Sequence, residues 1–248
     1  MTADAFSVFT GLDLARTALL FDVDGTLIDL APSPFEVDVP QSLKDSLLRL
    51  LDKTGGALAL VSGRPIRDLD LLFAPLQLPA VGGHGAETRL HANEAPARIA
   101  DLDAQLRREL VSAVAGNPEL ASEDKGYSVA LHFRKAPQEE ARIVSHVRQT
   151  LARFPHEQVE ILPGKAMIEI KRTGVSKGHA VRALMQREPF AGRTPVFIGD
   201  DVTDESVFAV MPDLDGINFS VSRQFAGVQH VFPAPADVRR ALARMAAT

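Results

Sequence analysis

Two short motifs far apart in the chain are rich in carboxylate side chains. Residues 22–26 read Asp-Val-Asp-Gly-Thr, and residues 199–204 read Gly-Asp-Asp-Val-Thr-Asp. Each motif directly follows an apolar run, residues 18–21 in the first case and residues 195–198 in the second. Because the carboxyl ends of parallel strands meet at one edge of an open α/β sheet, we expect both motifs at a shared rim. The carboxylates expected there are Asp22, Asp24, Asp200, Asp201 and Asp204.

Five carboxylates at one rim repel one another unless a cation neutralises them. The two motifs offer oxygen ligands only, since neither contains Cys or His. Such ligands favour a hard cation, and Mg²⁺ is the ion that suits them. We therefore expect Mg²⁺ as the cofactor.

Other polar residues are expected at the same rim. Ser62 and Arg64 follow the apolar run at 57–61, and Lys177 begins the helix that precedes the late strand. A metal ion with a lysine and a hydroxyl nearby can hold a phosphoryl group, so the set predicts phosphoryl transfer. Any one of these Asp residues could instead be a helix N-cap or a turn residue. The combination in this order favours the catalytic interpretation.

The elements that must position these residues alternate between strands and helices. We predict strands at the apolar runs and helices between them, such as the one carrying Leu43, Leu47 and Leu51 and the one at 177–186. Alternation of this kind indicates an α/β fold with a doubly wound, mostly parallel sheet. The strands are expected at residues 18–21, 57–61, 79–81, 195–198, 216–221 and 229–232.

The alternation is interrupted in the middle of the chain. We predict a helix at 96–115 and another at 137–154, together with three strands at 127–133, 159–162 and 167–171. This order is typical of a small inserted α+β domain. We therefore expect a catalytic core at 1–89 and 171–248, and a cap for substrate recognition at 90–170.

Composition excludes several classes of protein. The net charge is −5 and no run of Lys or Arg exceeds two residues, which argues against a nucleic-acid partner. No apolar run approaches the roughly 18 to 20 residues that cross a bilayer, and the absence of Cys excludes disulfides and thiolate zinc sites. Residues 1–13 lack the basic start of a signal peptide. We expect a cytoplasmic monomer whose partner is a small-molecule substrate, with no membrane association.

The motifs together resemble the haloacid dehalogenase superfamily of phosphatases. Finer stretches resemble its trehalose-6-phosphate phosphatase branch. The superfamily resemblance implies that Asp22 is a nucleophile that forms an aspartyl-phosphate. It also implies that Asp24 protonates the departing sugar oxygen and later takes a proton from water. The stretches that carry the resemblance to the branch are residues 83–87, 123–126, 130–134, 168–171 and 174–178.

The same resemblance implies roles for the remaining rim residues. Ser62 and Lys177 would hold the transferring oxygens. The metal would be bound by the side chains of Asp22 and Asp200 and by the backbone carbonyl of Asp24. Asp201 and Asp204 would orient water ligands or the lysine. The substrate contacts implied on the core side are the backbone N–H groups of Gly25 and Thr26, and Arg64.

In the cap, the resemblance implies that Glu123, Lys125 and Glu169 bind sugar hydroxyls. His132 and Arg134 are further candidates for substrate contact. Charged groups hydrogen-bond hydroxyls more strongly than neutral ones do, yet the same residues would also suit ordinary ion pairs on a solvated surface. His84 and Glu87, beside the expected boundary of the cap, are open to either a structural or a functional interpretation.

Two alternatives remain open at this stage. A capped phosphatase acting on sucrose phosphate, a mannosyl phosphate or a monosaccharide phosphate would carry the same catalytic rim. A protein that binds Mg²⁺ and a phosphosugar without catalysis is the alternative from another class. The resemblance to the branch favours trehalose 6-phosphate as substrate, and hence the last step of trehalose synthesis.

Overall fold

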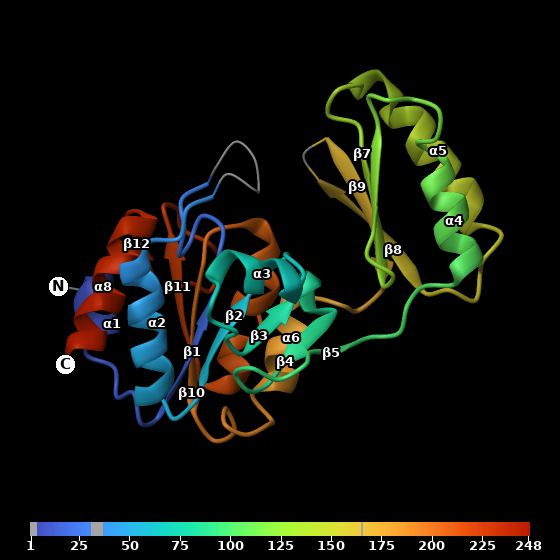
Figure 1. Ribbon diagram of the computed structural model, residues 1–248. Coiled ribbons are helices and arrows are strands. Elements are labelled where there is room, and N and C mark those ends of the chain that lie inside the picture. Colours follow the sequence, from blue (N-terminus) through green and yellow to red (C-terminus); the bar gives the residue numbers. More distant parts are fainter. Residues whose placement is uncertain (1–3, 31–36, 165) are drawn as a thin grey trace. The chain divides into compact units, whose positions relative to one another are not determined.

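The computed structural model describes residues 4–30, 37–164 and 166–248. The chain divides into two compact units, which Figure 1 colours along the sequence. The first comprises Met1–Arg98 and Ser176–Thr248, and the second is Ile99–Val175. The second unit begins nine residues later than the expected 90 and ends five residues later than the expected 170. Strand β5 (Ala97–Arg98) pairs in the sheet of the first unit, and β9 (Met167–Arg172) lies wholly in the sheet of the second.

The first unit is built on an eight-stranded sheet with the order β12-β11-β10-β1-β2-β3-β4-β5. The strands from β12 to β3 run parallel, and β4 and β5 add an antiparallel edge. This confirms the predicted doubly wound, mostly parallel α/β core. The bounds are β1 (Thr17–Phe21), β2 (Leu58–Val61), β3 (Ala80–Gly82), β4 (Glu87–Arg89), β10 (Thr194–Gly199), β11 (Ile217–Val221) and β12 (His230–Phe232).

Helices cover both faces of this sheet. Helices α1 (Ala5–Thr10), α2 (Gln41–Lys53), α3 (Ile66–Phe73) and α8 (Pro235–Ala247) pack on the face that holds Leu19 and Phe21. Helices α6 (Lys177–Leu184) and α7 (Glu205–Phe208) pack on the face that holds Ala18 and Leu20. Because β1 is buried on both faces, it reads in the sequence as one continuous apolar run.

The second unit is a four-stranded antiparallel sheet with two helices on one face, as Figure 1 shows. The strand order is β6 (Ala121–Asp124), β7 (Ser128–His132), β9 and β8 (Val159–Gly164). The apolar residues of α4 (Ala104–Ser112) and α5 (Glu140–Leu151) pack against Val129, Leu131 and Ile170 of the sheet. Because side chains alternate along a strand, Ala130 and Glu169 lie on the opposite face.

Two local predictions for this unit were wrong in detail. The helix expected at 96–115 is only α4, because the side chain of Asp103 accepts hydrogen bonds from the N–H groups of Gln105 and Leu106 and starts the helix there. Strand β6 was not predicted, since its residues are polar and mostly exposed. Short 3-10 segments occur at Gly83–Gly85, Pro137–Glu139, Val202–Asp204 and Met211–Leu214.

None of the helices within residues 4–30, 37–164 and 166–248 is long and apolar enough to cross a membrane.

Candidate active site

The two acidic motifs meet because β1 and β10 are adjacent parallel strands. Phe21 pairs with Ile198, and the N–H of Asp22 donates to the carbonyl of Ile198 at 2.9 Å. The loops that follow the two strands therefore leave the sheet side by side. Asp22 and Asp200, which are 178 residues apart in a chain of 248, thus share one rim, as the sequence predicted.

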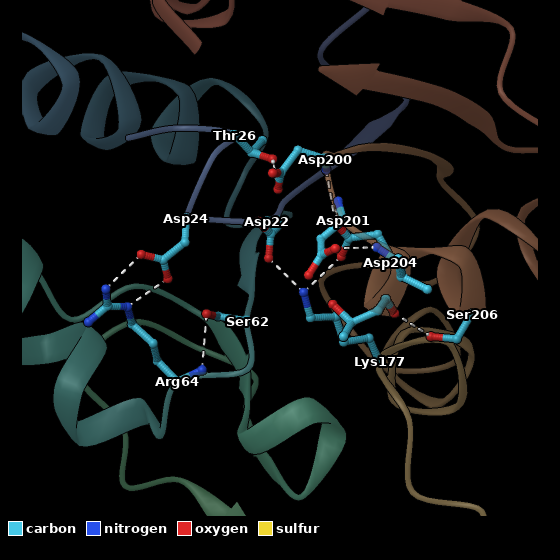
Figure 2. A network of polar contacts seen from close by, with 12 residues as sticks. Asp22, Asp24, Thr26, Ser62, Arg64, Lys177, Asp200, Asp201, Asp204 and Ser206 are labelled. Carbon is cyan, nitrogen blue, oxygen red and sulfur yellow. Dashed lines mark hydrogen bonds and ion pairs between the residues drawn. The ribbon is translucent and has the colours of Figure 1, made fainter. Parts of the chain in front are cut away.

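Lys177 links the nucleophile candidate to the second motif. Its Nζ donates to Oδ1 of Asp22 at 2.6 Å and to Oδ1 of Asp204 at 2.7 Å, and all three side chains are buried (Figure 2). Oδ2 of Asp204 accepts from the backbone N–H groups of Asp200 and Asp201. Asp204 therefore fixes both the lysine and the loop that carries Asp200.

Three carboxylates form a cluster that could hold a metal ion. One oxygen each from Asp22, Asp200 and Asp204 lies within 4.8 Å of the others. Burial, and then the charge of Asp204, raise the pKa of Asp22 well above its usual value, although Lys177 opposes the rise. Burial, together with Asp204 and Asp201, raises the pKa of Asp200 to about 6. A divalent cation would relieve this repulsion, and a cluster of carboxylate oxygens fits a hard cation.

The lysine is held as a cation within this cluster. Burial by itself would lower the pKa of Lys177, but the charges of Asp22 and Asp204 outweigh it and raise the pKa above its usual value. A buried ammonium in this position offers a fixed positive charge beside Asp22. It can therefore stabilise negative charge on a group that Asp22 contacts.

Gly25 and Thr26 pack directly against Asp200. Gly25 has φ +81°, and a Cβ built there would overlap the carboxylate of Asp200. Oγ1 of Thr26 donates to Oδ1 of Asp200 at 3.3 Å. The first motif therefore shapes the space that the carboxylate of the second motif occupies.

Asp24 does not join the carboxylate cluster but pairs with Arg64. Nε and Nη2 of Arg64 donate to the two carboxylate oxygens of Asp24 at 2.7 and 2.6 Å. Figure 2 shows Asp24 pointing toward Arg64 and away from Lys177. The buried Ser62 accepts from the backbone N–H of Arg64 at 3.1 Å through its Oγ. The sequence placed all three residues at the rim but did not foresee the pairing.

Asp201 is turned outward. Its side chain is 61 % exposed, accepts from the N–H of Val202 at 2.6 Å, and lies 3.6 Å from the guanidinium of Arg223. Arg223 also stacks over the ring of Phe225. Nothing in the sequence pointed to Arg223, because it belongs to neither motif.

A cavity of about 560 Å³ opens beside Asp24 and Asp200 in the first unit. Its volume is within the range of ligand pockets in general. The lining includes both acidic motifs together with the turn after β11, which holds Ser222 and Arg223.

His84 and Glu87 have structural contacts. Oε2 of Glu87 accepts from the N–H of Ile66 at 2.6 Å, at the first residue of α3. The His84 ring packs so closely over Gly63 that a Cβ at Gly63 would overlap it. These contacts support the structural interpretation of the two residues.

In the second unit, three charged side chains gather on the sheet face opposite the helices. Strand register places Glu123 and Glu169 on either side of Ala130. Nζ of Lys125 lies 3.5 Å from Oε1 of Glu169 and 3.8 Å from Oε2 of Glu123. Glu169 is buried and accepts from Oγ of Ser128 at 2.7 Å. Three candidates from separate stretches of the sequence thus form one cluster.

The two other cap candidates lie toward the far end of β7. His132 is the last residue of the strand, opposite Met167, and is partly buried. Arg134 is exposed in the turn beyond it. Arg134 is therefore not part of the cross-strand set formed by Glu123, Ala130 and Glu169.

Comparisons with known proteins show what this chain is similar to. The family model described as trehalose-phosphatase matches residues 20–235. The trehalose-6-phosphate phosphatase of Escherichia coli (strain K12) is 40 % identical over 233 residues, covering 88 % of this chain and 85 % of that protein. A probable trehalose-phosphate phosphatase of Sinorhizobium fredii is 42 % identical, covering 84 % of this chain and 79 % of its own length. Among solved structures, the C-terminal domain of the C. albicans trehalose-6-phosphate phosphatase shares the fold, with a TM-score of 0.77 at 19 % identity over 99 % of this chain and 97 % of that one.

Proposed function

Because the chain belongs to the trehalose-phosphatase family, we propose that it hydrolyses trehalose 6-phosphate to trehalose and phosphate, with Asp22 as the nucleophile. The observation that carries the proposal is the buried contact of Asp22 with Lys177, within the cluster formed with Asp200 and Asp204. The Lys177 ammonium, together with a cation held by the carboxylates, would bind phosphoryl oxygens that the carboxylates alone would repel.

The proposed reaction has two steps. In the first, a carboxylate oxygen of Asp22 attacks phosphorus, the bond from phosphorus to the sugar oxygen breaks, and Asp24 gives that oxygen a proton. In the second, water attacks the phosphorus of the aspartyl-phosphate, Asp24 takes the proton, and phosphate leaves as Asp22 is restored. Splitting the hydrolysis in this way replaces one difficult transfer by two easier ones.

The other core residues bind and orient. Lys177 and Ser62 would hold the phosphoryl oxygens. The backbone N–H groups of Gly25 and Thr26 do not take the part expected from the sequence, because they donate to the carbonyls of Ile28 at 2.8 Å and Val23 at 3.3 Å. Asp204 would keep Lys177 and the Asp200 loop in place, as its contacts with the Lys177 ammonium and with two backbone N–H groups support.

We further propose Mg²⁺ as the cofactor, held by the side chains of Asp22 and Asp200 and the backbone carbonyl of Asp24. The raised pKa values of Asp22 and Asp200 support this, since burial and mutual repulsion disfavour both charges when no cation is present. When bound, the ion would neutralise charge on the phosphoryl group.

The second unit would select the alcohol. Glu123, Lys125 and Glu169 offer acceptors and a donor on one sheet face, and charge-assisted hydrogen bonds suit a neutral sugar that is rich in hydroxyl groups. His132, the last residue of β7, and Arg134, in the turn beyond it, remain weaker candidates.

Phosphate release from a panel of sugar phosphates tests the proposal directly. The rate of phosphate release should be higher from trehalose 6-phosphate than from sucrose phosphate, a mannosyl phosphate or glucose phosphate. EDTA should abolish the activity. Asp22→Asn should remove turnover while the protein stays folded. The matched control is Asp213→Asn, an exposed carboxylate paired with Arg182 in the same unit, which should keep the wild-type rate. Near-normal rates in Asp22→Asn would exclude the covalent route.

We also propose, as expected from the sequence, that the protein is a monomer and is located in the cytoplasm. Light scattering coupled to gel filtration tests the oligomeric state, and fractionation of the source cells tests the location.

A further inference from the structure

The proposed reaction gives no role to the Arg64–Asp24 pair at the rim. Arg64 is 16 % exposed and Asp24 is 33 % exposed, so the pair is only partly shielded from water. Two parallel N–H···O bonds at 2.6 and 2.7 Å join one edge of the planar guanidinium to both oxygens of one carboxylate. This bidentate arrangement fixes orientation as well as distance, which one hydrogen bond would not do.

Arg64 is itself held at the backbone. Its N–H donates to Oγ of Ser62, and its carbonyl accepts from the N–H of Gly83 at 2.9 Å. Ser62 lies in the loop after β2 and Gly83 in the loop after β3, so the backbone of Arg64 is fixed by hydrogen bonds to both loops. An arginine whose backbone is fixed can orient a side chain on a different loop, here Asp24.

Asp24 needs such a partner. It is not held by the Lys177 cluster, and an aspartate that is one-third exposed can change its side-chain rotamer at little cost. A group that transfers protons must nevertheless lie within hydrogen-bond reach of a defined oxygen. The geometry therefore favours a role for Arg64 toward Asp24 over the direct substrate contact expected from the sequence.

We propose that Arg64 is a positioning residue that acts through Asp24, holding the carboxylate in the orientation from which it works. The inference rests on the proposed role of Asp24 in proton transfer. It does not depend on which sugar phosphate is the natural substrate.

A double-mutant cycle separates this role from substrate binding. The variants are Arg64→Gln, Asp24→Asn and the double variant, assayed with Mg²⁺ on p-nitrophenyl phosphate and on trehalose 6-phosphate. Arg64→Gln should lower kcat about tenfold to a hundredfold, part of the roughly 10² to 10⁴ that general acid-base catalysis supplies, with KM within about twofold. In the Asp24→Asn background the same change should alter the rate by less than about twofold, since residues acting as one unit are not additive.

Two results would overturn the proposal. An equal loss from Arg64→Gln in both backgrounds would mean that the arginine acts independently of Asp24. A raised KM with unchanged kcat would make Arg64 a substrate ligand. The matched control is Arg182→Gln, which removes an exposed Arg–Asp pair with Asp213 in the same unit and should leave both constants unchanged.

Arg64→Lys provides a second measurement, also if Arg64→Gln folds poorly. Lysine keeps the charge but lacks the planar fork, so its kcat should stay close to that of Arg64→Gln. A wild-type kcat in Arg64→Lys would contradict the proposal that Arg64 orients Asp24. Failure of the proposed function would look different, because the wild type would then not turn over trehalose 6-phosphate although the cycle on p-nitrophenyl phosphate could still be completed.

Discussion

Gly25 and Asp200 are so close that no side chain larger than hydrogen fits at residue 25. A Cβ there would overlap the Asp200 carboxylate, and the backbone has φ +81°. The close approach brings the loop after β1 against the loop after β10. The position of Asp200 in the carboxylate cluster therefore depends on a glycine, which has no side chain of its own.

Gly25→Ala should therefore lose Mg²⁺-dependent activity, because the methyl group displaces Asp200. Gly116→Ala is the matched control, since Gly116 has φ +80° and a Cβ added there would meet nothing within 4 Å. Both variants should lose roughly 1 to 2 kcal/mol of stability from the left-handed backbone. Phosphate release titrated with MgCl₂, alongside thermal unfolding, measures the two effects. Equal activity in the two variants would contradict the role of the close approach.

The affinity for Mg²⁺ should increase with pH through the titration of Asp200. Its folded pKa of about 6 lies above the ordinary 3.8, so the folded state binds its proton more tightly than the unfolded state does. Without metal, stability should fall as pH rises from about 4 to 6, while the carboxylate becomes available to the ion. The rise in Tm on adding MgCl₂ should be small at pH 5 and larger at pH 7. A rise that does not depend on pH would count against Asp200 as a ligand.

A stability prediction concerns a buried ion pair away from the site. Arg89 is 2 % exposed and donates to both carboxylate oxygens of Asp70, on α3, at 2.6 and 2.9 Å. Asp70→Asn leaves the arginine charge buried without its partner and should cost about 3 kcal/mol. Asp68→Asn, on the same helix and paired with the exposed Arg67, should cost under about 1 kcal/mol. Urea unfolding measures both, and comparable losses would refute the distinction.

Substrate selectivity should depend on Glu169. Glu169→Gln should lower kcat/KM for trehalose 6-phosphate about tenfold to a hundredfold, the value of a lost charge-assisted hydrogen bond, and should spare p-nitrophenyl phosphate. Glu160→Gln is the matched control, because Glu160 is a far more exposed carboxylate on β8 of the same sheet. Similar losses on both substrates would show that Glu169 supports the fold and does not recognise the sugar.

The sequence predicted the parts of the fold whose burial is complete. The strands β1, β2 and β10 are almost wholly buried, so each appears as an apolar run ending in polar residues. Strand β6 escaped prediction because exposed polar residues carry no periodic signal. Helix α4 was predicted too long, since Ile99 and Leu102 happen to continue the helical spacing before the Asp103 cap.

For the site, the sequence could place residues at a rim but not pair them. The position after a strand located Asp22, Asp24 and Asp200, whereas side-chain direction decides which carboxylate meets Lys177 and which meets Arg64. The hydrogen bond from the N–H of Ile66 to Glu87 could not be predicted either. The two residues are 21 positions apart, and no local sequence pattern indicates that a side chain so distant caps a helix.

The adjacency of β1 and β10 has a consequence for the newly made chain. As the polypeptide leaves the ribosome from its N-terminus, Asp22 emerges long before its partners at 177, 200 and 204. A nascent chain that ends before β10 contains Asp22 but lacks the second acidic motif, and so also lacks the contact between Lys177 and Asp204. Phosphatase activity should therefore arise only after residue 204 has been translated and β10 has paired with β1, and termination before β10 should yield inactive fragments.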